Sequence, residues 1–217
     1  MLSKKVSLEK FLKICEGKNI ELDSGKLRLL ERYVNTLLEE NKKVNLISRK
    51  SERDIWEKQI LESVAVLKVV NLLKEAKVLD FGTGGGLPGI PLKILEKDWD
   101  LTLIDSTKKK IDAVKRIIKK IELKKVKAVW SRGEELSKNK YYKNKFDFVL
   151  ARGAGKLDYI IKNSIDFLKK DGKIVVWKGG DIREELQSVK GYNKIEVLDL
   201  DVEGLVEKKV VLIGIRN

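Results

Sequence analysis

The sequence predicts an α/β fold in which a mostly parallel, seven-stranded sheet carries helices on both faces. Two observations predict it. From Lys77 onward, short β-prone apolar runs alternate with segments of helical periodicity, which is typical of a parallel sheet with right-handed crossovers. A glycine-rich turn follows the first of these runs and leads into a helical segment, as in folds that bind a ligand at the end of a strand.

The residues that precede the sheet predict a helical extension. Apolar residues recur at helical spacing in three segments, and Ser24 is placed to cap the second of them. The expected helices lie within 8–17, 24–43 and 55–67, with a connector at 45–48. Because no linker rich in proline or glycine follows, we expect residues 1–74 to pack on a core domain of residues 75–217.

The alternation continues through the second half of the sequence. A final pair of apolar runs, separated by Asp201 to Glu207, is spaced like an antiparallel hairpin. The expected strands are 78–81, 101–105, 126–130, 146–150, 173–177, 193–198 and 208–215, with helices at 108–121 and 157–168.

The segment from Lys77 to Pro91 predicts a ligand-binding loop. Its glycines allow the backbone to turn tightly and to approach a ligand, and the helix that follows offers free N–H groups to a carboxylate or phosphate. Asp105 ends the next strand about twenty residues later, where an acidic side chain reaches a ribose hydroxyl in βαβ units. Together these features indicate a cofactor that contains a nucleoside.

The glycine pattern by itself fits two cofactors. Gly84, Gly86 and Gly89 match the G-x-G-x-x-G pattern of dinucleotide-binding proteins. Asp80, directly before the glycines, fits better the loop of Rossmann-like methyltransferases that bind S-adenosylmethionine. An NAD-dependent oxidoreductase therefore remains the rival interpretation, although it would need a substrate domain and a proton donor.

Composition restricts the chemistry and indicates a partner. The 217 residues include one cysteine, Cys15, and no histidine, which excludes a disulfide framework, a Cys/His zinc site and a histidine general base. We expect no metal. The net charge of +14 indicates a polyanionic partner such as nucleic acid, and the high lysine and glutamate content is also typical of thermophiles. Without an apolar run of about 20 residues or a signal-peptide core, we expect a cytoplasmic protein off the membrane.

Several segments, in order and spacing, resemble the bacterial 16S ribosomal RNA guanine-N7 methyltransferases, the family of glucose-inhibited division protein B. The resemblance covers nearly the whole chain, and its most specific part is the Leu-Pro-Gly-Ile-Pro extension of the glycine loop. The family usually has His and Asp where this chain has Gln59 and Glu62, and Arg-Ala-Glu where it has Arg132, Gly133 and Glu134. The matching segments are 45–48, 59–63, 78–91, 103–106, 109–110, 131–136, 146–152 and 177–180.

The resemblance implies a class I S-adenosylmethionine-dependent methyltransferase fold and the residues that would hold the cofactor. Asp105 would accept hydrogen bonds from the ribose hydroxyls, Ser106 and Thr107 would lie beside the adenine, and Asp80 would orient the loop. The whole cofactor set implied is Asp80, Gly82, Gly84, Gly86, Leu87, Asp105, Ser106, Thr107, Gly133, Glu134 and Arg152.

Basic residues near the expected pocket are candidates for RNA contacts. Arg152 and Lys178 end neighbouring strands, where ligands bind in open α/β sheets, and are also the candidate catalytic residues. Lys108, Lys109 and Lys110 open a helix, where the helix dipole disfavours cations. With Arg132, these side chains would contact 16S ribosomal RNA in the small ribosomal subunit.

Guanine N7 is compatible with this residue set because it carries a lone pair and no proton. Methyl transfer to it needs no general base, only alignment of N7 with the methyl group. Methylation of pyrimidine C5 would need a cysteine nucleophile, and Cys15 lies in the N-terminal extension. A non-catalytic RNA-binding protein of the same fold remains a third interpretation. In the absence of a long apolar patch, we expect a monomer.

Overall fold

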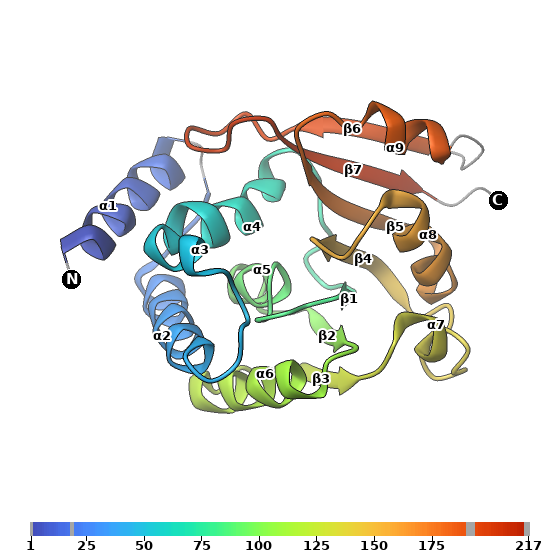
Figure 1. Cartoon of the computed structure of the whole chain (residues 1–217), viewed down its shortest axis with the longest axis horizontal. Helices are drawn as coiled ribbons and strands as arrows, with labels where there is room; N and C mark the ends of the chain where they lie inside the picture. The colour runs from blue at the N-terminus through green and yellow to red at the C-terminus, as the bar shows by residue number, and fades with distance from the viewer. Residues whose placement is uncertain (1, 18–19, 190–193, 215–217) are drawn as a thin grey trace.

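A computed structural model describes residues 2–17, 20–189 and 194–214 (Figure 1). Their centre is a seven-stranded sheet in the order β3-β2-β1-β4-β5-β7-β6. The first five strands are parallel, and β7 pairs antiparallel with β5 and β6. The strands are β1 (Lys77–Phe81), β2 (Asp100–Asp105), β3 (Val126–Trp130), β4 (Phe146–Arg152), β5 (Leu168–Gly179), β6 (Lys194–Asp199) and β7 (Lys208–Gly214).

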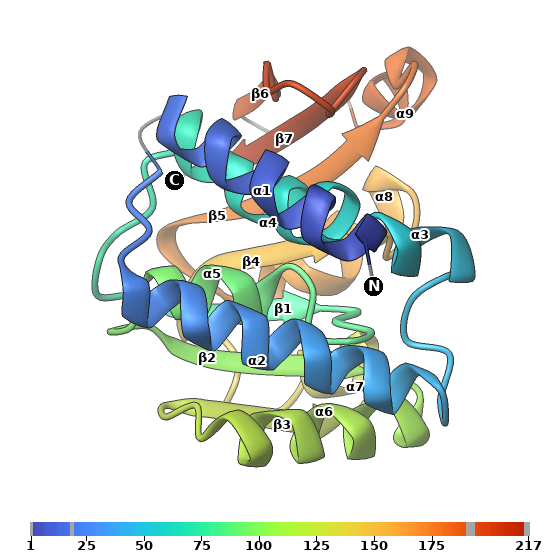
Figure 2. The ribbon, with the colours of Figure 1, turned by 90° about the vertical axis from the view of Figure 1, so that its left-hand side faces the viewer.

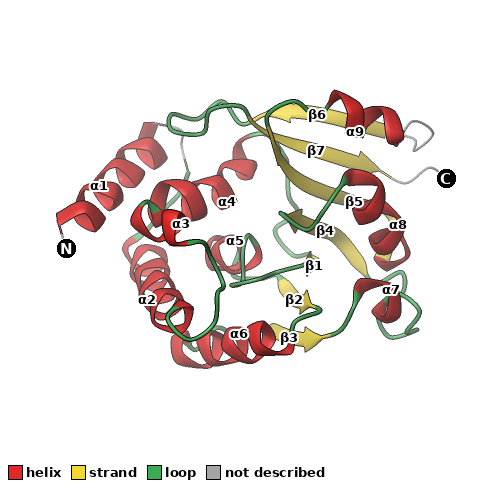
Figure 3. Cartoon of the chain, viewed as in Figure 1, coloured by secondary structure: helices red, strands yellow, loops and turns green. Residues whose placement is uncertain are grey.

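The strands of the sheet bury apolar side chains on both faces, as parallel strands between helical layers must. Val78 of β1 belongs to the larger apolar core, whereas its neighbour Leu79 belongs to the core on the opposite face. α5 (Gly89–Leu95) and α6 (Lys108–Ile121) pack on the first face, and α8 (Leu157–Ser164) packs on the second. Figure 3 shows the sheet between these two layers. The predicted α/β fold is confirmed.

The N-terminal helices share the larger core with the sheet. Phe11 of α1 (Leu2–Gly17) and Leu37 of α2 (Ser24–Asn41) are fully buried in the same cluster as Val78. In Figure 2, α2 lies along α5 and α6, and α1 lies along the segment that contains α4. That segment begins with α3 (Arg49–Arg53) and continues through a π-helix (η1, Trp56–Leu61), α4 (Glu62–Val64) and a 3-10 turn (η2, Ala65–Lys68). The division of the chain at residue 74 stays a prediction.

Some expected boundaries are wrong. Asp23, not Ser24, caps α2: its Oδ1 accepts hydrogen bonds from Gly25 N and Lys26 N at 2.8 Å each. The helix expected to reach residue 168 ends as α8 at Ser164, followed by a 3-10 turn (η3, Ile165–Phe167), and Leu168 already begins β5. The expected hairpin is β6 and β7, although its terminal residues Asn193 and Ile215 lie outside the described residues. None of the described helices has the length and apolar character to span a membrane.

Candidate functional site

The glycine loop leaves β1 at Phe81 and leads into α5, next to the point where strand order reverses between β1 and β4. At Gly86, φ is +97° and an added Cβ would lie 2.4 Å from Ile90 Cδ1, so only glycine fits there. The loop is also anchored from outside, because Thr83 N donates to Ile104 O at 2.9 Å and Tyr33 Oη donates to Gly85 O at 3.1 Å. Its shape is therefore fixed by contacts to β2 and to α2.

Asp80 lies fully buried beneath the loop. Its Oδ2 accepts hydrogen bonds from Thr83 Oγ1 at 2.7 Å and from Gly89 N at 3.0 Å. Its Oδ1 has no partner, and burial raises the pKa of this carboxyl to about 6. The predicted role of Asp80 in orienting the loop agrees with these bonds, but the side chain does not line the cavities that adjoin the loop.

Two adjoining cavities open at the carboxyl ends of the parallel strands, on either side of the loop. The smaller has a volume of about 240 Å³ and lies beside the ends of β1 and β2. The larger has a volume of about 700 Å³ and extends over the ends of β4 and β5 to the N-terminal helices. Gly82, Lys110 and Gly153 line both cavities. A ligand could therefore extend from one into the other, as expected at a strand-order switch point.

Asp105 lines the smaller cavity. Its Oδ2 accepts a hydrogen bond from Gly84 N at 3.1 Å, and its Oδ1 accepts one from Thr107 N at 2.8 Å. A carboxylate can accept about four hydrogen bonds, so capacity remains for hydroxyl groups of a ligand. Ser106 and Thr107, which the resemblance places beside the adenine, line the same cavity.

Gly133 and Glu134 of α7 (Gly133–Leu136) also line the smaller cavity. Glu134 Oε1 accepts a hydrogen bond from Tyr159 Oη at 3.0 Å, whereas its buried Oε2 has no partner. An unpartnered carboxylate oxygen beside a cavity can accept a donor from a ligand. Trp130 lies outside the cavity with 57% of its surface exposed, and its Nε1 donates to Ser106 O at 3.0 Å.

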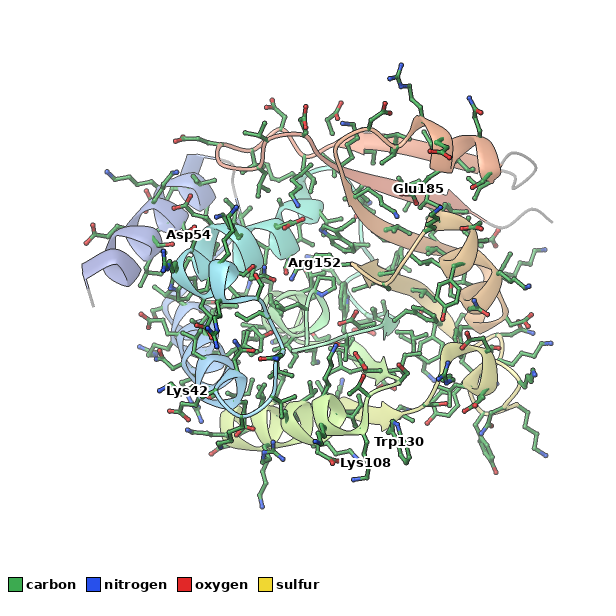
Figure 4. The ribbon with its side chains drawn as sticks, in the orientation of Figure 1. Lys42, Asp54, Lys108, Trp130, Arg152 and Glu185 are labelled. Atoms are coloured by element: carbon green, nitrogen blue, oxygen red, sulfur yellow. The ribbon has the colours of Figure 1, made fainter. Side chains whose placement is uncertain are left out.

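Arg152 lies at the centre of the molecule, between the N-terminal helices and the end of β4 (Figure 4). Its side chain is only 12% exposed and donates to Gln59 Oε1 at 2.6 Å, to Gln59 O at 3.1 Å and to Ser63 Oγ at 3.2 Å. Burial lowers the pKa of this guanidinium. Arg152 therefore lines the larger cavity, but most of its donors are used to connect β4 with the helical extension.

Lys178 and the lysines of α6 differ in how far they are available to RNA. Lys178 Nζ donates to Gly155 O at 2.9 Å and to Glu185 Oε2 at 2.6 Å, so it helps to fix the loop after β4. Lys108 pairs with Asp112 at 2.8 Å on the exposed face, while Lys109 is exposed without lining either cavity. Lys110 lines both cavities, and the exposed Arg132 lines the smaller one.

Two parts of the site were not predicted from the sequence: the place of the connector over the larger cavity and the contribution of Lys208. The connector Leu46–Ser48 covers the larger cavity and is held by the buried Asn41, whose Oδ1 accepts from Leu46 N at 2.6 Å and from Ile47 N at 2.9 Å. Lys208 enters the same cavity from β7. Asn41, which ends α2, could have indicated a turn held by its side chain, because asparagine often bonds to nearby backbone groups. Nothing in the local sequence distinguishes Lys208 from other lysines.

Known proteins are similar to this chain along most of its length. The family described as rRNA small subunit methyltransferase G, GidB, matches residues 26–212. The ribosomal RNA small subunit methyltransferase G of Desulforamulus reducens is 36% identical over 184 residues, which are 84% of this chain and 76% of the relative. The protein of that name from Clostridium novyi is 31% identical over 225 aligned positions, covering 100% of this chain and 93% of the relative.

The chain belongs to the small-subunit rRNA methyltransferase G family. The fold agrees with this assignment. A solved structure of an S-adenosylmethionine-dependent methyltransferase from Aquifex aeolicus matches 72% of this chain and 92% of its own, with a TM-score of 0.55 and 18% identity. The predicted family, the class I fold and the use of S-adenosylmethionine by an rRNA methyltransferase are confirmed.

The structure shows the surroundings of the two segments in which this chain differs from the usual sequence of the methyltransferase G family. Gln59 Oε1 accepts a hydrogen bond from the guanidinium of Arg152. Glu62 lines the larger cavity and pairs there with Lys208. At Gly133, an added Cβ would lie 2.2 Å from Phe81 Cε2, so the ring of Phe81 occupies the space that an alanine would need. Among the described residues, no cluster of three or more His, Cys, Asp or Glu could hold a metal ion.

Of the remaining cofactor residues predicted from the sequence, Gly82, Gly84 and Leu87 line the larger cavity. Gly86 does not line either cavity. Its positive φ and the closeness of Ile90 to the place of a Cβ explain why this residue is a glycine. The structure thus brings most of the predicted residues to one continuous site and places Asp80 and Gly86 in its support.

Proposed function

We propose that this methyltransferase transfers the methyl group of S-adenosylmethionine to N7 of a guanine in 16S ribosomal RNA. The observation that carries the proposal is the pair of adjoining cavities, which provide separate places for a nucleoside and for a base to be methylated. Guanine N7 has a free lone pair, so the reaction can proceed in a chain without histidine.

The residues present fit the cofactor. In the proposal, Asp105 accepts from the ribose hydroxyls, Ser106 and Thr107 border the adenine, and the unpartnered Oε2 of Glu134 accepts from a donor of the base. Gly82, Gly84 and Leu87 border the methionine end in the larger cavity. When bound, S-adenosylmethionine supplies an electrophilic methyl group on a sulfonium.

The larger cavity has room for more than the end of a cofactor, since its volume of about 700 Å³ falls in the range of sites that enclose whole ligands. We assign the remaining space to a guanine that is extruded from the RNA. Arg152 acts there as a positioning residue that fixes Gln59 and the wall formed by η1. Lys110, Arg132 and the first-turn lysines of α6 contact the RNA backbone, and Lys178 fixes the loop after β4.

The substrate particle and the state of the protein are part of the proposal. The family name supports the small ribosomal subunit as the substrate, and from that substrate we infer a cytoplasmic protein. Large exposed apolar residues, such as Leu73, Tyr141 and Val206, lie in separate connecting segments of the chain, which supports a monomer. Size-exclusion chromatography with light scattering should give the monomer mass; a dimer mass would contradict this part.

The test is methyl transfer from labelled S-adenosylmethionine to small ribosomal subunits that lack modifications, followed by nuclease digestion and nucleoside mass spectrometry. We expect label in 7-methylguanosine and its loss in Asp105→Ala, whereas Asp112→Ala, a partly exposed acid on α6 that lines neither cavity, keeps activity. Transfer to another nucleoside would refute the N7 assignment. Binding of a nicotinamide dinucleotide without transfer would favour the oxidoreductase, and RNA binding without cofactor affinity would favour a non-catalytic protein.

A further inference from the structure

The larger cavity contains an ion pair that the cofactor assignment leaves unexplained. Glu62 of α4 and Lys208 of β7 both line it, and Glu62 Oε1 lies 2.8 Å from Lys208 Nζ. The Glu62 side chain is 11% exposed and that of Lys208 is 36% exposed. The same cavity is lined by the glycine loop and by Arg152. A negative and a positive group therefore lie next to each other in the space assigned to the target base.

The position of Glu62 is fixed by groups from the core. Trp177 Nε1 donates to the carbonyl oxygen of Glu62 at 2.9 Å, and Arg152 Nη1 lies 3.9 Å from the carboxylate Oε2. Trp177 is itself buried, with 3% of its surface exposed. Glu62 is thus held between β4, β5 and β7, unlike an acid on a mobile surface. Such a side chain can hold a ligand in one orientation at little additional cost in entropy.

We propose that Glu62 and Lys208 read the Watson–Crick edge of the target guanine, an inference that rests on the proposed function. Guanine presents O6, an acceptor, next to two donors, N1–H and the 2-amino group. The Glu62 carboxylate accepts from both donors, and the adjacent Lys208 ammonium donates to O6. Adenine presents a lone pair at N1 and a donor at its 6-amino group, so both protein groups oppose it.

This arrangement also suits the position of the reacting atom. O6 lies between N1 and N7 on the edge of the base, so contacts to O6, N1–H and the 2-amino group leave N7 without a hydrogen bond. A cation placed on N7 would instead occupy the lone pair that attacks the methyl group. The pair therefore selects guanine and leaves its nucleophilic atom free to face the glycine loop.

Two other roles for the pair make different predictions. Glu62 could serve only to balance the charges of Arg152 and Lys208, in which case its replacement lowers stability without changing base preference. The pair could also bind the amino and carboxylate groups at the methionine end of the cofactor, in which case its replacement weakens cofactor binding. The experiment must therefore measure base preference, cofactor affinity and folding together.

The experiment uses an RNA fragment with the methylated guanine and the same fragment with inosine at that position, which lacks only the 2-amino group. The full-length protein is compared with Glu62→Gln, Glu62→Asp and Glu57→Gln. Glu57 is the matched control, because it belongs to η1 and pairs with Lys10 at 3.0 Å but does not line the cavity. Calorimetry gives the affinity of each variant for S-adenosylmethionine, and circular dichroism reports folding.

We expect the unaltered protein to have a kcat/KM about tenfold lower on inosine, as for a lost hydrogen bond to a charged group. Glu62→Gln should reduce this preference to about threefold or less, with cofactor affinity unchanged. Glu62→Asp should restore part of it, and Glu57→Gln should keep all of it. If Glu62→Gln does not fold, Lys208→Met is tested with 6-thioguanine, whose sulfur is a weak acceptor, and should lose the preference for guanine over that base.

An unchanged inosine preference in Glu62→Gln would overturn the inference while leaving the methyltransferase activity established. A large loss of cofactor affinity in that variant would assign the pair to the methionine end and also overturn it. In the Lys208→Met assay, a retained preference for guanine over 6-thioguanine would have the same consequence. Absence of 7-methylguanosine with the unaltered protein would refute the proposed function and this inference with it.

Discussion

Several charged residues at the site make hydrogen bonds to the loops and helices around them, in addition to any contact they would make with a ligand. Asp80 accepts from Thr83 and Gly89, Arg152 donates to Gln59, and Lys178 donates to Gly155 and Glu185. Each of these charged groups lies at the end of a strand and holds the adjoining loop or helix. The positions that would touch the ligand are therefore fixed by buried polar contacts, as preorganised sites require.

The titration of Asp80 should appear in the pH dependence of stability. Burial raises the pKa of this carboxyl from 3.8 to about 6, so between these values the folded state binds more protons than the unfolded state. Its contribution to the free energy of unfolding therefore decreases as pH rises from about 4 to 6 and is constant above. Urea unfolding at pH 4 to 7 should show that the free energy of unfolding of Asp80→Asn, relative to that of the unaltered protein, increases by up to ~3 kcal/mol as pH rises through this range. A difference that is independent of pH would contradict the assignment.

Gly133 and Phe81 should be energetically coupled. An added Cβ at residue 133 would lie 2.2 Å from Phe81 Cε2, and the ring is buried, with 5% exposed. Gly133→Ala should therefore lower the free energy of unfolding by ~1 to 3 kcal/mol, the usual range for overpacking. In Phe81→Val with Gly133→Ala, thermal or urea unfolding should show a smaller loss than the sum of the single changes. Additive losses would indicate that the ring moves aside freely.

At the scale of elements, most strands could be predicted because each is an apolar run between polar turns. The start of β5 could not, since Asp171 has a φ of +67° and the β4–β5 register shifts between Phe146 and Phe148. The irregular π, α and 3-10 segment from Trp56 to Lys68 also follows from tertiary packing and not from periodicity.

The site was predictable to a similar degree. Asp105 and the glycines are consecutive or belong to one βαβ unit, so local sequence indicates them. The contact of Lys208 with Glu62 joins residues of different elements that only the folded chain brings together. The connector Leu46–Ser48 was identified as a segment, but its position over the cavity depends on the clamp by Asn41. Contacts between distant segments are what the sequence alone did not reveal.

The first turn of α6 should contribute to RNA affinity through charge. Lys108, Lys109 and Lys110 lie together at the end nearest the cavities, and Figure 4 shows Lys108 near Trp130 at this edge. Changing all three to Gln should reduce the slope of log K against log salt by about one to two, because fewer counterions are released. The matched control replaces the exposed Lys115, Lys119 and Lys124, which lie further along α6 or after it. Equal effects of the two triple variants would show that only net charge matters.

At the scale of the whole molecule, the helical extension shares the larger of the two apolar cores with the sheet. The larger apolar cluster extends from Phe11 in α1 through Leu37, Val78 and Leu103 to Leu212 in β7. Charged groups join the same parts: Arg116 of α6 donates to Glu40 of α2 through Nε at 2.9 Å and Nη2 at 2.6 Å. The arrangement indicates that the extension cannot separate from the sheet without exposing buried apolar surface.

We therefore expect one cooperative unfolding transition. Trp56 of η1 and Trp177 of β5 are both buried, so tryptophan fluorescence reports on the extension and on the sheet, and far-ultraviolet circular dichroism should give the same urea midpoint. Phe11 is fully buried, with its ring centroid 5.2 Å from that of Trp56. Phe11→Ala should lower the free energy of unfolding by ~3 to 5 kcal/mol and shift both signals together. Different midpoints for the two signals, or two steps in either of them, would mean that the extension unfolds as a separate unit.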